Sequence, residues 1–126
     1  SGILLAGIEG SILYNFGSHQ YSQGDMWSKV IGLIPGLLIN KMSYGHYLDI
    51  FVSHAPPWKI HDGIDRPHMG IKAFLWLDKV FQPLYHLHGH IHVYRQDTTI
   101  ETKIGKTMVI NTYGYRVITL PAERIC

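Results

Sequence analysis

The stretch YLDIFVSHAPPW, residues 47–58, decides the fold. An apolar run, Leu48 to Val52, stands directly before a histidine, His54, and two prolines. A short apolar run with β-branched members is typical of a buried strand in an α/β fold. Because Pro56 and Pro57 cannot donate to a strand ladder, the strand has to end near His54. A histidine in that position lies where open α/β sheets bind their ligands, at the carboxyl end of a strand.

The segments around this strand alternate between strand and helix patterns. The expected elements are a strand over Ile3 to Ala6, helices over Asp25–Ile34, Pro35–Met42 and residues 70–84, and a strand over Leu84 to His88. Two helices are expected around Pro35 because proline lacks the N–H that a helix interior needs. From Val93 onward, β-branched residues with turn signals at Gly105 and Gly114 predict an antiparallel hairpin and a final strand. The expected fold class is α/β, with helices outside a layered sheet.

The bulk composition predicts a single domain over residues 1–126, with 46% hydrophobic and 16% charged residues. The net charge is only +2 and the basic residues are scattered, so a nucleic-acid partner is open but unsupported by charge. No membrane partner is expected, because the most apolar run, residues 31–39, is too short to span a bilayer. The single cysteine, Cys126, cannot form an internal disulfide, which favours a reducing compartment and a cytoplasmic location.

Histidine is the unusual residue of this chain, with nine copies. The stretch LYHLHGHIHVYR, residues 84–95, holds four of them at alternate positions: His86, His88, His90 and His92. Gly89 is expected to turn the backbone sharply after the strand. His90 and His92, two apart in an extended segment, should project to one side. With His54 from the neighbouring strand, three imidazoles are expected to converge, and histidine is the commonest metal ligand.

The two stretches together resemble a known family. DIFVSHAPP, residues 49–57, followed after about 30 residues by HGHIH, residues 88–92, resembles the last two motifs of the calcineurin-like metallophosphoesterases. Residues 7–26 are similar to the mid-chain segment of the smaller bacterial and archaeal-type members, so the resemblance covers essentially the whole chain. It implies a four-layer α-β-β-α sandwich, of which this chain is the C-terminal part ending in an antiparallel β-hairpin. It also implies metal-dependent hydrolysis of a phosphomonoester or phosphodiester.

The resemblance assigns metal ligands residue by residue. His54 and His90 would hold one divalent ion and His92 the other. In the family, such a pair of ions clamps the phosphate and activates a water molecule. Imidazole suits manganese, iron, zinc and nickel, so the native metal is not predicted.

The other family motifs are missing, namely an Asp-x-His, a Gly-Asp-x-x-Asp and a Gly-Asn-His-Asp/Glu. The sequence has only one Gly-Asp, at Gly24-Asp25, and one His-Asp, at His61-Asp62, and neither fits. We therefore expect a C-terminal half that is inactive alone. The favoured explanation is an N-terminal half that is cleaved or unseen; a partner chain or strand exchange in a homo-oligomer are the others. The alternative function is a catalytically dead binding or scaffolding module.

The remaining candidates surround the predicted ligands. His88 is expected to be a buried strand histidine or a residue that orients a ligand, and His86 a plain strand or surface residue. His19 and His46 are expected to be loop histidines. The loop KIHDGIDRPHMG, residues 59–70, is either solvated or a substrate rim. The rim candidates are His61, Asp62, Arg66 and His68. In the rim interpretation, Arg66 binds phosphate bidentately and His68 assists catalysis.

Overall fold

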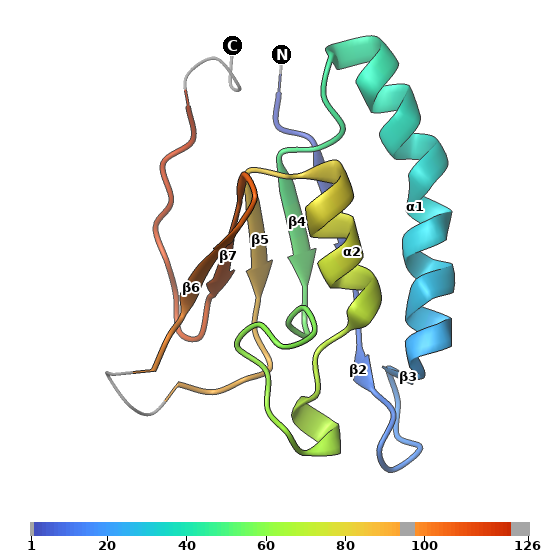
Figure 1. Ribbon diagram of the computed structural model, residues 1–126, viewed down its shortest axis with the longest axis vertical. Helices are drawn as coiled ribbons and strands as arrows, with labels where there is room; N and C mark the ends of the chain where they lie inside the picture. The colour runs from blue at the N-terminus through green and yellow to red at the C-terminus, as the bar shows by residue number, and fades with distance from the viewer. Residues whose placement is uncertain (1, 94–97, 122–126) are drawn as a thin grey trace.

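Strand β4, Ile50–Ser53, lies inside a five-stranded sheet of order β1-β4-β5-β7-β6 (Figure 1). The computed structural model describes residues 2–93 and 98–121. The other strands are β1 (Leu5–Ile8), β5 (Tyr85–His88), β6 (Glu101–Ile104) and β7 (Thr107–Asn111). All neighbours pair in parallel except β6 and β7, which form an antiparallel hairpin. The predicted α/β class, a strand before His54 and the hairpin are therefore confirmed. The strand covers Ile50–Ser53 rather than Leu48 to Val52, and it is buried on one face only, because Val52 is 45% exposed.

Two helices cover one face of this sheet (Figure 1). They are α1 (Gln23–Tyr44) and α2 (Lys72–Phe81). Their apolar sides bury Met26, Val30 and Phe74 against Phe51 of β4, and these four side chains are fully buried. Near the carboxyl ends of the strands lie a short parallel pair, β2 (Ser11–Ile12) and β3 (Gln20–Tyr21), and the 3-10 helix η1 (Arg66–His68). Packing on one face thus leaves the strand ends free to carry side chains into solvent.

The expectation of two helices around Pro35 is wrong, because α1 is one helix of 22 residues with Pro35 inside it. The missing N–H leaves the carbonyl of Ile31 without its helical partner, but Ile31 is 57% exposed and water can reach this turn. Buried Val30 and Leu37 hold the helix to the core on both sides of the proline. Tertiary packing therefore outweighs the local preference to stop.

Two further boundaries differ from the sequence-based expectation. The first strand covers Leu5–Ile8 rather than Ile3 to Ala6, because β1 follows the register of β4, in which Leu5 pairs with Ile50. The final strand predicted after Gly114 is wrong: residues 115–121 form no strand. Residues 94–97, at the predicted start of the hairpin, lie outside the described part of the chain.

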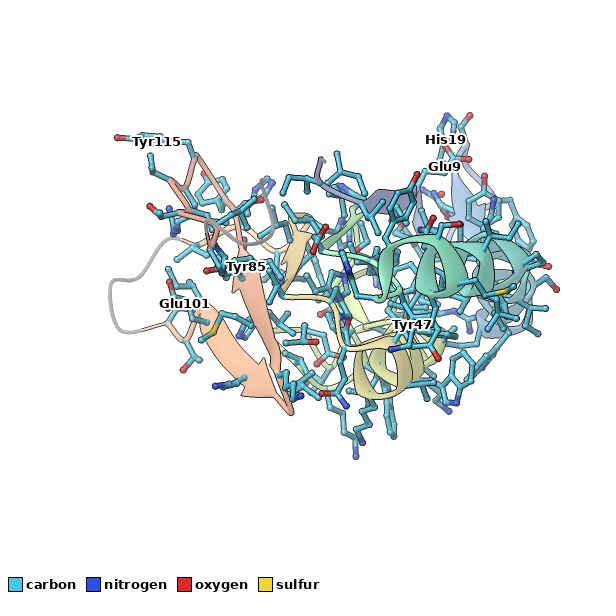
Figure 2. The ribbon with its side chains drawn as sticks, turned by 90° about the horizontal axis from the view of Figure 1, so that it is seen from above. Glu9, His19, Tyr47, Tyr85, Glu101 and Tyr115 are labelled. Atoms are coloured by element: carbon cyan, nitrogen blue, oxygen red, sulfur yellow. The ribbon has the colours of Figure 1, made fainter. Side chains whose placement is uncertain are left out.

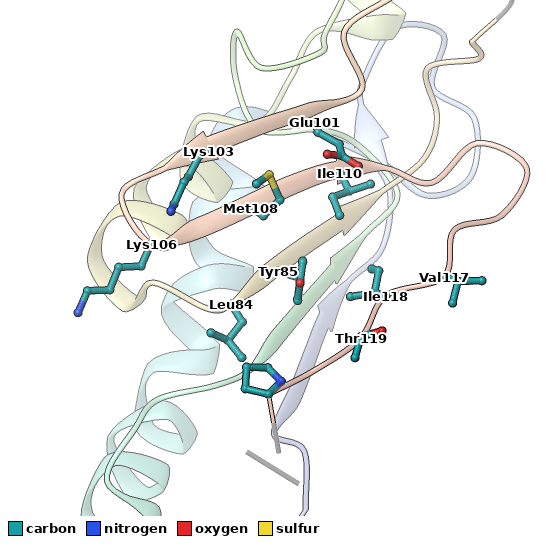
Figure 3. A pocket seen from close by; sticks show the side chains of 11 residues that line it. Leu84, Tyr85, Glu101, Lys103, Lys106, Met108, Ile110, Val117, Ile118 and Thr119 are labelled. Carbon is teal, nitrogen blue, oxygen red and sulfur yellow. The ribbon is translucent and has the colours of Figure 1, made fainter. Parts of the chain in front are cut away.

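The second face of the sheet is apolar and carries no helix among the described residues. Leu5 and Val52 on this face are 66% and 45% exposed. Over its other half runs the C-terminal segment, and a pocket of about 520 Å³ lined by Ile118 and Tyr85, among others, lies between the two (Figure 3). In the part of the chain that the structure describes, neither helix combines the length and apolar character that crossing a membrane requires.

Candidate functional site

The carboxyl ends of β4 and β5 bring two of the predicted ligands together. His54 directly follows β4, and the amide of Gly89, which directly follows β5, donates to the carbonyl of His54 at 3.0 Å. This bond joins the ends of the two parallel strands. His90, the next residue, then places its ring 4.7 Å from the ring of His54, measured between centroids. The convergence expected from the strand positions is present for this pair.

The hydrogen bonds of His90 decide which of its nitrogens faces His54. Its Nε2 donates to the carbonyl of Pro67 at 2.5 Å, so Nδ1 carries the free lone pair. That Nδ1 lies 2.9 Å from Nε2 of His54. A metal-binding histidine is commonly oriented in this way, with its other N–H bonded to a carbonyl. Burial, followed by the charges of His90 and His92, lowers the pKa of His54, which favours the neutral, metal-binding imidazole.

The backbone at this point is not the one expected from the sequence. His90 has a left-handed conformation with φ of 64°, so the extended segment predicted for His90 and His92 is wrong. The sharp turn lies at His90 itself, where the amide of Ile91 bonds back to the carbonyl of Gly89 at 2.7 Å. A non-glycine residue held in this region costs conformational energy, and such residues gather at functional sites.

His92 takes a different position from His54 and His90. Its ring stacks on that of Tyr113, with centroids 5.0 Å apart and planes 18° apart. It remains close enough for its charge to affect the pKa of His54. Its assignment as the ligand of a first metal therefore stays a prediction, as do those of His54 and His90.

The pair His54 and His90 can be compared with the geometry of a bound metal. Two nitrogens that bind one ion at about 2.0–2.1 Å lie about 2.8–3.4 Å apart for angles of about 90–110° at the ion. The observed 2.9 Å is close to this separation. Within residues 2–93 and 98–121, however, no group of three or more His, Cys, Asp or Glu side chains is placed to hold a metal. The described residues therefore fit one ion held by two imidazoles, and they do not assemble a two-ion centre.

A second histidine pair lies deeper, between the rim loop and β5. Nδ1 of His61 is 3.1 Å from Nε2 of His88, and Thr102 donates to Nε2 of His61 at 2.7 Å. Nδ1 of His88 in turn donates to the carbonyl of Gly89 at 3.0 Å. Each neutral ring thus donates once and accepts once. Burial lowers the pKa of both, and that of His88 falls to about 3. His88 is buried, as one of its two predicted roles required.

The other rim candidates have contacts within the fold. The carboxylate of Asp62 accepts from the amides of Lys59 at 2.9 Å and Gly70 at 2.8 Å, which closes the loop. Nε of Arg66 donates to the carbonyl of Leu13 at 2.8 Å.

His68 pairs with a carboxylate on the rim. Its Nδ1 lies 2.6 Å from Oδ2 of Asp65, and its ring is 5.2 Å from that of His90. Asp65, His68, His90 and His92 line a shared pocket of about 640 Å³. His68 is thus the rim candidate that the structure brings to the pair.

His86 lies in strand β5, one of its two expected positions, but the surface alternative is wrong, because His86 is fully buried on the helix-covered face. Its Nδ1 lies 2.6 Å from Oδ2 of Asp78, also fully buried, and its Nε2 lies 2.7 Å from Oγ of Ser53. Burial raises the pKa of Asp78. A sequence signal existed, because Asp78 stands four residues after Phe74 and three before Phe81, on the apolar side of the helix.

Ser53, His86 and Asp78 thus form a buried chain of hydrogen bonds, called the buried chain below. It has the Ser-His-Asp order of a catalytic triad, which suggests that Ser53 is a nucleophile. Its geometry does not support that interpretation. The hydroxyl of Ser53 donates its proton to the carbonyl of Ala55 at 2.7 Å rather than to His86. Ser53 is also only 6% exposed, so a substrate has little access to it. The chain instead holds β4, β5 and α2 together and fixes the turn that contains His54.

Comparisons of the chain with protein-family models, with curated proteins and with solved structures found no match.

Proposed function

We propose that the chain carries the histidine-bearing part of a metal-dependent phosphoesterase site that hydrolyses a phosphomonoester or phosphodiester. The observation that carries the proposal is the His54–His90 pair at the carboxyl ends of two adjacent parallel strands, with Nδ1 of His90 freed by its bond to Pro67. Ligands of open α/β sheets bind at this edge. The HAPP and GHIH stretches that resemble the calcineurin-like family supply these same two histidines.

Each residue of this site has a distinct task. His54 and His90 would hold a divalent ion, which when bound stabilises charge on a phosphoryl oxygen and lowers the pKa of bound water. The carbonyl of Pro67 keeps His90 in the ligating tautomer. Arg66 keeps nitrogens besides Nε for a phosphate oxygen while its Nε is fixed on Leu13. His68 and His92 line the pocket next to the pair.

The same proposal includes the sandwich and its missing carboxylates. Leu5 and Val52 expose an apolar sheet face of the kind that a second sheet would cover. The groups that would complete a two-ion centre would come from an N-terminal part, a partner chain or a strand-exchanged copy. The described chain alone should be inactive, because two neutral imidazoles provide no carboxylate to bridge two ions.

The experiment tests metal binding and hydrolysis together. The full-length natural protein, His54→Ala, His90→Ala and His46→Ala are titrated with Zn²⁺ and Mn²⁺ by calorimetry. They are also assayed on p-nitrophenyl phosphate and bis(p-nitrophenyl) phosphate. His46, bonded to Asp49 at the opposite end of β4, is the matched control. We expect both site variants to lose at least the 10- to 100-fold in metal affinity that loss of an outer partner costs. Activity should fall with affinity, and equal activity in His90→Ala and the unmodified protein would remove the proposal.

A second candidate function is a binding or scaffolding module without catalysis. It is favoured by the lack of any three-residue ligand group within the described ranges. The same titration separates the two: a full-length protein that binds no divalent ion and hydrolyses neither ester would support the module.

A further inference from the structure

Another histidine–carboxylate pair joins the residue after β1 to the residue before β3, and the proposed site does not use it. Glu9 and His19 lie side by side at one corner of the molecule (Figure 2). Nδ1 of His19 is 2.7 Å from one carboxylate oxygen of Glu9. The hydroxyl of Tyr21 donates to the other oxygen at 2.7 Å, and Nζ of Lys29 is 4.0 Å from it. The carboxylate is therefore held on both oxygens, with one of them aimed at the imidazole.

The backbone around the pair is tightly constrained. Gly10 has φ of 95°, and a Cβ there would lie 2.5 Å from the ring of Tyr21 and 2.8 Å from the carbonyl of His19. That carbonyl accepts from the amide of Ser11 at 3.1 Å. His19 itself is left-handed, with φ of 59°. Non-glycine residues in this conformation persist where the surroundings determine them, and they cluster at functional sites.

The pair shares a pocket with the proposed metal ligands. Glu9, His19, His54 and His90 are among the residues that line a pocket of about 400 Å³. A substrate held at His54 and His90 would therefore place part of its structure beside His19.

A purely structural role does not account for this arrangement. The side chains of His19 and Glu9 are 69% and 55% exposed, and exposed ion pairs contribute little to stability. The hydrogen bond from Tyr21, followed by smaller effects of His19 and Lys29, lowers the pKa of Glu9. Glu9 is thus a carboxylate at neutral pH and can accept the Nδ1 proton of His19. Because Nδ1 of His19 faces Glu9, Nε2 is the nitrogen that can donate a proton to a ligand.

We propose that His19, oriented by Glu9, is the general acid that protonates the leaving group of the phosphoester; this inference rests on the proposed function. A water oxygen forms the new bond to phosphorus while the bond from phosphorus to the ester oxygen breaks. The ester oxygen takes the Nε2 proton of His19 and leaves as an alcohol. His19 regains its proton from solvent, which also receives the proton lost by the attacking water. A general acid of this kind typically contributes about 10²- to 10⁴-fold to the rate.

The test uses esters that differ in their need for a proton. The full-length protein, His19→Gln, Glu9→Gln and the control His46→Gln are assayed with Mn²⁺ on p-nitrophenyl, phenyl and methyl phosphate esters. The p-nitrophenolate ion leaves without protonation, whereas phenolate and above all methoxide need it. We expect His19→Gln to lose about 10²-fold or more on the methyl ester and only a few-fold on the p-nitrophenyl ester. Glu9→Gln should lose less activity on the methyl ester. It should also shift the high-pH limb of the kcat/KM profile, where the general acid loses its proton.

The outcomes separate this inference from the proposed function. An equal loss on all three esters in His19→Gln, with metal affinity unchanged, would overturn the general acid and leave the phosphoesterase. A loss that is largest on the methyl ester in His68→Gln, but not in His19→Gln, would also overturn it. The general acid would then belong to the His68–Asp65 pair. If the unmodified protein hydrolyses none of the esters, the proposed function falls and the inference falls with it.

Discussion

His86 and His90 stand four residues apart, yet they belong to opposite environments. The ring of His86 is fully buried between Asp78 of α2 and Ser53 of β4, which supply the hydrogen-bond partners of its two nitrogens. The ring of His90 lies at the rim, bonded to His54 and to a loop carbonyl. The difference arises from the backbone, because strand alternation directs His86 towards the helices and a left-handed residue redirects His90.

The same residue type thus stabilises the fold in one place and remains available for a ligand in the other. In the buried chain each of the two imidazole nitrogens of His86 has a fixed protein partner. In the pair at the rim, His90 keeps one nitrogen whose partner is another imidazole, and a metal ion can take that partner's place. Removal of a buried partner and removal of a rim partner should therefore have different consequences.

The largest expected effect is on stability in the buried chain. His86→Ala would leave the Asp78 carboxyl and the Ser53 hydroxyl without their partner, next to the rings of Phe51 and Phe74. Breaking a buried pair in this way typically costs about 3–5 kcal/mol. Urea denaturation measures the loss. The control is His68→Ala, which removes an exposed histidine–aspartate pair and should leave the free energy of unfolding nearly unchanged. Similar losses in the two variants would contradict the distinction.

The next effect is a dependence of stability on pH that originates in the buried His61–His88 pair, called the inner pair below. The pKa of His88 is about 3 in the folded protein, against an ordinary value of 6.5 for a solvated histidine. Because the unfolded chain then binds the extra proton, stability is complete above pH 6.5 and declines as the pH falls towards 3. The slope for one such histidine is about 1.4 kcal/mol per pH unit, or about 2 kcal/mol between pH 6.5 and 5.

Urea denaturation at several pH values tests this slope. His88→Gln offers an amide that can still donate to Gly89 and accept from His61, but it does not titrate. The variant should lose stability less steeply on acidification than the unmodified protein. An unchanged slope would assign the acid sensitivity to other groups.

A smaller effect should connect the two regions. The hydroxyl of Ser53 bonds to His86 and to the carbonyl of Ala55. Ser53 and Ala55 stand on either side of His54 in the sequence, so the second bond spans the turn at His54. Ser53→Ala removes both bonds and should cost about 1–3 kcal/mol, the penalty of leaving a buried partner unsatisfied. Zn²⁺ affinity should also weaken several-fold, because the turn that holds His54 loses its anchor. If calorimetry finds the affinity unchanged while stability falls, the buried chain and the rim act independently.

The smallest effect is expected for the hydrogen bond between Thr102 and His61, the more exposed histidine of the inner pair. Thr102→Val keeps the shape of the side chain but removes the hydroxyl that donates to His61. Both residues are half-buried, so the loss should be about 0.5–1.5 kcal/mol, as for one ordinary hydrogen bond. Thermal unfolding of Thr102→Val and Ser53→Ala under the same conditions shows which variant loses more stability. A larger loss in Thr102→Val would place the more important anchor in the rim loop.

The part of the fold that follows from local patterns could be predicted from the sequence. The apolar run before His54, the strand before Gly89 and the hairpin around Gly105 each depend on neighbouring residues, and the structure has them all. The meeting of His54 and His90 also followed, because adjacent parallel strands end at one edge of a sheet.

The remaining features depend on contacts between distant segments. The burial of His86 requires Asp78 from a helix and Ser53 from another strand, and the choice of the covered face is made only in three dimensions. The left-handed turn at His90 has no signal in a residue that is not glycine. The Glu9–His19 pair is set by a loop whose ends are joined through the short pairing of β2 and β3. Loop geometry of this kind is not encoded in periodicity.

The proline inside α1 divides that helix into two units of unequal protection against hydrogen exchange. Before Pro35, Met26 and Val30 are fully buried, so opening these turns requires disruption of the core. After it, Leu37 is the buried residue, while Ile39 and Met42 are 61% and 86% exposed. The amides after Pro35 should therefore exchange by local opening at a lower free energy than those before it. The helix is continuous in its geometry, but on the timescale of exchange it should behave as two segments that meet at the proline.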